Sequence, residues 1–131
     1  MTEDVPKITF TLISDLTESE AKSLINELKK EPEIVIAKTS KTLSGGLVEA
    51  FFIGITVSLS VDLLRKGAPI AYKRGKNLIK KIFKKSANVA KEKKKPVLEL
   101  HYETLTLTFN SASDDEIERN LEKLHLYAYP E

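Results

Sequence analysis

The sequence of 131 residues predicts a single α+β domain, residues 1–131, in which helices cover a mixed sheet of about four strands. Three observations predict this fold class. A strand–helix–strand pattern opens the chain, two helical segments occupy its middle, and a strand hairpin followed by a capped helix closes it. The 41% hydrophobic and 31% charged residues are typical of a globular protein with a buried core.

The first third of the chain predicts a βαβ unit. Residues 7–13, KITFTLI, alternate apolar and polar side chains with the period of two that a half-buried strand requires. An amphipathic helix at 18–30 begins behind the capping-box pair Thr17 and Glu20 and ends before Pro32. A second strand follows at 33–39. Two strands joined by one helix run parallel if they share a sheet, so we expect the sheet to be mixed.

The hydrophobic stretch at 47–64, LVEAFFIGITVSLSVDLL, allows three interpretations. A membrane span is disfavoured because Glu49 and Asp62 close a short uncharged run. A strand agrees with the period-two alternation over 53–61, where Ile53, Ile55, Val57, Leu59 and Val61 alternate with smaller residues. A buried helix agrees better with the length of the apolar stretch, which exceeds that of a typical strand. We therefore expect a core helix here and keep the strand and the span as alternatives.

The segment 76–91 predicts a basic amphipathic helix. Its apolar residues, among them Leu78, Ile79, Ile82 and Phe83, fall on one side of a helical wheel. The other side carries the lysines that form the candidate electrostatic binding face: Lys80, Lys81, Lys84, Lys85 and Lys91. We refer to these five residues as the lysine face.

The last third predicts a hairpin and a helix. Residues 97–109 alternate as two strands that reverse near Glu103 and Thr104, although no glycine marks the turn; one long bent strand is the alternative. Ser113 and Glu116 form a second capping box, which starts the final helix.

No catalytic, cofactor or metal site is predicted. The chain has no cysteine, which excludes disulfides and thiolate chemistry, and it has neither a P-loop nor a nucleophile-elbow motif. His101 is expected to face solvent. The acidic run Asp114-Asp115-Glu116 is explained by the preference of a helix start for negative charge. A non-enzymatic protein is therefore expected.

The charge distribution nevertheless indicates a surface with a function. Residues 65–95 hold 13 basic residues and one acidic residue, a net charge of +12, whereas the rest of the chain holds eight basic and 18 acidic residues, a net charge of −10. Such a segment can bind nucleic acid or an anionic membrane surface through phosphate contacts. Alternatively, acidic elements of the same fold balance it.

The order of elements resembles that of the effector-associated constant component family of bacterial conflict systems. The resemblance is carried by the segments KITFTLIS, INELKKEPEI, LSGGLVEAFFIGI, IKKIFKK and LELHYETLTLTF. The chain departs from the family in its lysine-rich segment at 73–95 and in the missing turn glycine near residue 103. The resemblance implies a non-catalytic adaptor, with a protein partner that is an effector enzyme of a bacterial defence system. With no cysteine and an acidic N-terminus unlike a signal peptide, we expect a cytoplasmic protein, associated with membrane only through its surface.

Overall fold

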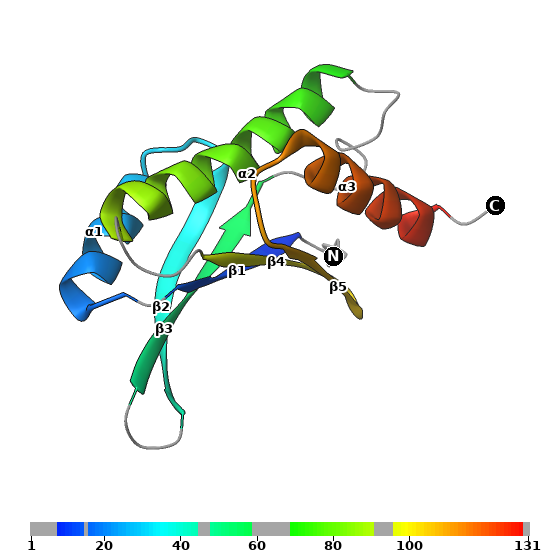
Figure 1. Ribbon diagram of the computed structural model, residues 1–131. Coiled ribbons are helices and arrows are strands. Elements are labelled where there is room, and N and C mark those ends of the chain that lie inside the picture. Colours follow the sequence, from blue (N-terminus) through cyan, green and yellow to red (C-terminus); the bar gives the residue numbers. More distant parts are fainter. Residues whose placement is uncertain (1–7, 15, 45–47, 59–68, 91–95, 130–131) are drawn as a thin grey trace, which may run out of the picture.

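The computed structural model describes residues 8–14, 16–44, 48–58, 69–90 and 96–129, which form five strands and three helices (Figure 1). In chain order these are β1 (Thr9–Ser14), α1 (Glu18–Leu28), β2 (Ile34–Ser44), β3 (Val48–Val57), α2 (Pro69–Ala90), β4 (Val97–Tyr102), β5 (Leu105–Phe109) and α3 (Asp114–Ala128).

The strands form one sheet in the order β2-β3-β1-β4-β5, and every neighbouring pair is antiparallel. The prediction of a mixed sheet is therefore wrong, and the sheet has five described strands where about four were expected, whereas the α+β class is confirmed. β1 and β2 do run in the same direction, as the βαβ pattern predicts, but β3 lies between them and pairs with both. The first six elements thus give the split βαβ arrangement of ferredoxin-like folds, extended by β5 and α3.

The core helix expected at 47–64 is wrong, because residues 48–57 form β3. Ile53, Ile55 and Val57 are each at most 2% exposed, whereas Gly54 between them is exposed. This period of two is the strand signature, and it outweighs the length of the apolar stretch. That length misled because it continues into residues 59–64, which lie outside the described part of the chain.

The two predicted helices at 18–30 and 76–91 are present with different ends. α1 has both hydrogen bonds of the capping box: the Glu20 backbone N–H donates to the Thr17 hydroxyl (3.1 Å), and the Thr17 N–H donates to the Glu20 carboxylate (2.9 Å). α2 begins at Pro69, seven residues before the predicted start, because proline suits the first turn of a helix. Lys91 lies outside the described residues.

All three helices lie over the same face of the sheet (Figure 1). Directly opposed residues on neighbouring strands point to the same face, so the register identifies the covered face across all five strands. Leu12 lies opposite Ile53 and Leu98, and Leu98 lies opposite Phe109. All four side chains are completely buried. The core is therefore the layer between this face and the helices.

The C-terminal hairpin is confirmed, with Tyr102 paired to Leu105 across the two-residue turn Glu103-Thr104. Glu103 has φ = 54°, in the left-handed region that favours glycine. The sequence pattern lacks the usual turn glycine, and the fold forces a glutamate into its conformation instead.

α3 is attached to the adjoining β5 edge. Ser113 caps the helix as predicted by accepting from the Glu116 N–H (3.3 Å), but the Glu116 carboxylate accepts from the Asn110 N–H and the Ser111 hydroxyl (2.8 Å each). Asn120, which is buried, donates to the Thr108 carbonyl (3.0 Å). These bonds hold α3, the third helix of the layer, close to β5.

Replacing Glu103 by glycine is expected to stabilise the fold by about 1 kcal/mol, because it relieves the cost of a left-handed Cβ. Urea unfolding of Glu103→Gly and of Glu103→Ala measures this effect. The alanine variant removes the same exposed carboxylate but keeps the Cβ, so it should not gain stability. Equal gains in both variants would contradict the assignment of strain to the backbone.

Candidate functional site

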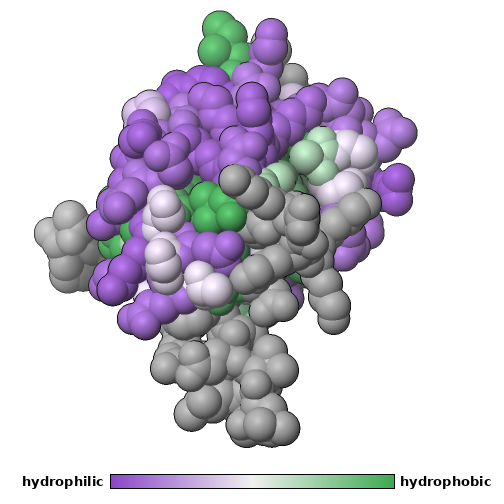
Figure 2. Space-filling model, turned by 60° about the vertical axis from the view of Figure 1, so that its left-hand side comes forward, coloured by the Kyte–Doolittle hydropathy of each residue, from purple (hydrophilic) through white to green (hydrophobic). Residues whose placement is uncertain are grey.

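The predicted lysine face lies on α2, whose apolar side packs into the core. Leu78, Ile79, Ile82 and Phe83 are buried as expected, and the lysines occupy the remaining surface. Figure 2 shows a largely hydrophilic surface at the height of α2, with hydrophobic side chains reaching the surface below it. The charge of this helix is the first candidate for a functional site.

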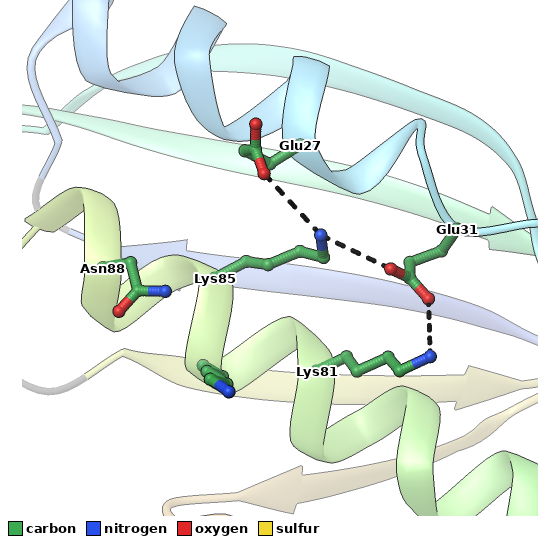
Figure 3. A pocket seen from close by; sticks show the side chains of 6 residues that line it. Glu27, Glu31, Lys81, Lys85 and Asn88 are labelled. Atoms are coloured by element: carbon green, nitrogen blue, oxygen red, sulfur yellow. Dashed lines mark hydrogen bonds and ion pairs between the residues drawn. The ribbon is translucent and has the colours of Figure 1, made fainter.

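On one side, α2 forms ion pairs with the C-terminal end of α1 (Figure 3). Lys81 donates to Glu31 (3.0 Å), and the Lys85 ammonium lies between Glu31 (3.4 Å) and Glu27 (3.8 Å). Glu27 also accepts from Lys30 (2.7 Å). The Glu31 side chain is only 12% exposed, so this cluster is partly shielded from water.

On the other side, α2 forms ion pairs with the start of α3. Lys80 pairs with Asp114, and Lys76 pairs with Glu118 (2.7 Å). Toward the start of β2, Arg74 pairs with Glu33 (3.2 Å). Basic residues of α2 thus have carboxylate partners on both flanks.

These contacts shift the pKa of several groups toward the charged form. The hydrogen bond from Lys81 lowers the pKa of Glu31 below its ordinary value of 4.5, and Lys85 adds to the effect. In the same way, Lys80 lowers the pKa of Asp114. The hydrogen bond to Glu118 raises the pKa of Lys76. The cluster therefore remains ionised over a wider pH range than its isolated groups.

The lysine face is consequently divided. Lys80, Lys81 and Lys85 are paired, Lys84 is exposed and makes no ion pair with the described residues, and Lys91 lies outside them. The sequence indicated, as an alternative, that acidic elements of the same fold balance the basic segment, but not which carboxylates pair with these lysines. The signal for them was the excess of acidic residues outside 65–95, which nearly equals the basic excess within it.

A shallow groove of about 240 Å³ lies between α1 and α2. It is lined by Glu27, Glu31, Lys81, Lys84, Lys85 and Asn88. Figure 3 shows that Glu27, Glu31, Lys81 and Lys85 bond to one another across it. The groove thus lies between two helices, and four of its five charged side chains are already paired with one another, Lys84 being the exception among the described residues.

The second candidate surface is the face of the sheet opposite the helices, which we call the open face. Its described residues form three rows across the strands. The first row holds Lys38, Gly54, Thr11, Glu99 and Thr108; the second holds Ile36, Thr56, Thr9, His101 and Thr106; the third includes Phe52, Ile13 and Val97. None of these residues is buried. The open face thus combines threonines with a few apolar and charged side chains.

His101 lies in the second row of the open face and is half-buried, consistent with its predicted orientation away from the core. Its ring nitrogens lie 3.1 Å from the Thr11 hydroxyl and 3.3 Å from the Thr106 hydroxyl, and Glu99 is 3.5 Å from Nε2. Within the described ranges, no group of three or more His, Asp or Glu side chains is arranged to hold a metal ion.

The third candidate surface is the outer edge of β2. No described strand pairs with this edge. The register between β2 and β3 shifts at Ile34–Ile36, a bulge that leaves Val35 61% and Ile36 42% exposed. An edge strand with exposed apolar side chains is a template for pairing with another chain.

No helix in the described part of the chain is long and apolar enough to cross a membrane. Comparison with protein-family models, curated proteins and solved structures gives no match for this chain. The resemblance to effector-associated constant components therefore stays a prediction, and one of its elements, the apolar helix at 47–64, is replaced by β3 over residues 48–57.

Replacing Glu31 by glutamine is expected to reduce the loss of stability in acid. Because the folded pKa of Glu31 is lowered, its contribution is fully present above its ordinary pKa of 4.5 and is lost as the pH falls through the folded value. Glu31→Gln should be less stable than the native chain at pH 7, and the difference should shrink as the pH falls below the ordinary pKa of 4.5 and through the lower folded value.

Thermal unfolding across this pH range measures the effect. Glu103→Gln is the matched control, since it removes an exposed carboxylate that has no ion pair among the described residues. A Glu31→Gln variant that keeps the full acid sensitivity of the native chain would contradict the assigned role.

Proposed function

We propose that this chain is a non-enzymatic protein-interaction module, an adaptor that couples an effector enzyme to a partner in a bacterial defence system. The observation that supports it most directly is the outer edge of β2, which is unpaired in the described sheet and carries Val35 and Ile36 exposed at a bulge. Main-chain hydrogen bonds at such an edge provide affinity for an extended segment, and exposed side chains provide specificity.

The arrangement of the sheet also favours this use of β2. The strand is 11 residues long, and its distal part pairs with β3 beyond the end of β1, so the hairpin extends past the body of the sheet (Figure 1). A partner strand can therefore align beside β2 without contacting the helices. The polar groups that line the α1–α2 groove bond mainly to one another, which favours binding over catalysis.

A photo-crosslinking residue at Val35 is expected to capture one discrete partner protein in native cells. The control places the same residue at Ile70, which is 79% exposed at the start of α2. In addition, Val35→Asp should abolish co-purification of the captured protein while the thermal unfolding midpoint stays unchanged. Identical crosslinks from both positions would overturn the proposal.

A second candidate function is binding of nucleic acid or an anionic membrane surface by α2. Lys73 and Lys84 favour it, because both are exposed and make no ion pair with the described residues. The pairing of Lys80, Lys81 and Lys85 weakens it, since a phosphate must compete with a carboxylate for each of them.

If α2 binds duplex DNA through Lys73 and Lys84 alone, the logarithm of affinity should fall with the logarithm of salt concentration with a slope of about −2. Engagement of the whole lysine face would give about −4.5. Titrations with duplex DNA and with anionic vesicles separate the two ligands, and Lys73→Glu with Lys84→Glu should abolish binding. Retention of neither ligand at low salt excludes this function.

A further inference from the structure

Gly54 is unexplained by the contacts of the described chain. It lies in the middle of β3 on the open face, and a Cβ placed there would meet no atom closer than the Lys38 carbonyl oxygen at 4.0 Å. Its φ is not in the left-handed region. Glycine weakens the interior of a strand, and it often marks a place where another backbone or a ligand approaches closely. An approach from outside the chain would account for it.

The charges of the open face are arranged symmetrically about Gly54 and its neighbour Thr11. Lys38 lies beside Gly54 on β2, and Glu99 lies beside Thr11 on β4, so the four residues form one cross-strand row. The two charged residues are separated by two strands, about 14 Å, so they do not contact each other within one chain. Lys38 is exposed and makes no ion pair with the described residues.

From this row we infer that the open face binds the open face of a second copy of the chain. A twofold axis parallel to the strands, between β3 and β1, places β3 of one copy opposite β1 of the other and β2 opposite β4, with β5 outside the overlap. Lys38 then faces Glu99 of the second copy, and Glu99 faces its Lys38. Gly54 faces Thr11 across the interface, where the absent side chain gives room.

The third row agrees with the same axis. Phe52 on β3 and Ile13 on β1 lie opposite each other on either side of the axis. Phe52 of one copy therefore faces Ile13 of the second copy, and Ile13 faces its Phe52. Both side chains are half-buried in a single chain, and apposition removes more of their apolar surface from water. Sheets that pack face to face lie about 10 Å apart, a distance that Lys38 and Glu99 side chains span together.

The size of the open face fits a weak, transient dimer. Four strands and three rows cover roughly 20 Å by 20 Å. This projected area lies below the roughly 600 Å² per copy that bounds the class of weak, transient interfaces. The dimer is therefore expected to dissociate on dilution. The dimer covers Ile36, which faces His101 of the second copy, but the unpaired backbone groups along the outer edge of β2 lie outside the interface. This inference therefore does not rest on the proposed adaptor function.

A charge exchange between Lys38 and Glu99 tests the inference. Sedimentation equilibrium of the full chain should show a reversible monomer–dimer equilibrium. Lys38→Glu should weaken dimerisation at least about tenfold, because it places two carboxylates opposite each other at both sites. The double variant Lys38→Glu with Glu99→Lys should restore the native dissociation constant. Lys84→Glu, the same charge change at an exposed lysine of α2, should leave dimerisation unchanged.

Gly54→Val provides an independent readout. A β-branched residue suits the strand, so the thermal unfolding midpoint of the dilute monomer should rise, whereas dimerisation should be lost because the side chain meets Thr11 of the second copy. A chain that is monomeric at every concentration overturns the inference. So does a dimer that Lys38→Glu and Gly54→Val leave intact, or one that the double charge exchange fails to restore.

Discussion

β3 joins β2 to the rest of the sheet, since it pairs with β2 on one side and with β1 on the other. Its side chains Ile53 and Ile55 point toward the helices. Both are almost completely buried beneath the helices. Each such side chain contributes about 1.5–3 kcal/mol through burial, and these contributions depend on α1 and α2 lying on the same face. The position of the helix layer, and with it the open face, follows from the side to which β3 points its isoleucines.

The charges of α2 are arranged around this layer. The helix must cover the sheet with its apolar side, which leaves its basic residues between α1 and α3. Carboxylates from both flanks, such as Glu31 and Asp114, pair with them. Exposed ion pairs individually add little stability. Their larger effect is on the surface potential, because the paired lysines of α2 lie among carboxylates and form a surface of mixed charge.

Much of the fold could be predicted from local patterns. The capping residues Thr17 and Ser113 start their helices, and the alternation in 97–109 forms the hairpin. The wrong strand order has a physical origin: the sequence period describes a strand's faces but not its neighbours. Nothing in residues 7–39 indicates that β3 inserts between β1 and β2, so these two strands were expected to pair with each other in parallel. The helix expected at 47–64 had another origin, the length of the apolar stretch, which outweighed the period of two.

The candidate sites were predictable to a smaller degree. The lysine face could be predicted because its residues are close in sequence. Its carboxylate partners could not be predicted, because Glu31 and Asp114 are 50 and 34 positions from the lysines with which they pair. The open face could not be predicted for the same reason. Its first row, which includes Lys38, Gly54, Thr11 and Glu99, can be recognised only once the strand order is known.

The central place of β1 in the sheet has a consequence for how the chain assembles. β1 is made first, yet its partners β3 and β4 end at residues 57 and 102. During synthesis the β2–β3 hairpin can form as soon as it emerges, whereas Phe10 and Leu12 must wait for strands that are still untranslated. β1 therefore lacks at least one of its neighbouring strands until residue 102 has been made. The centre of the sheet can close only after that point, when the strands on both sides of β1 are available.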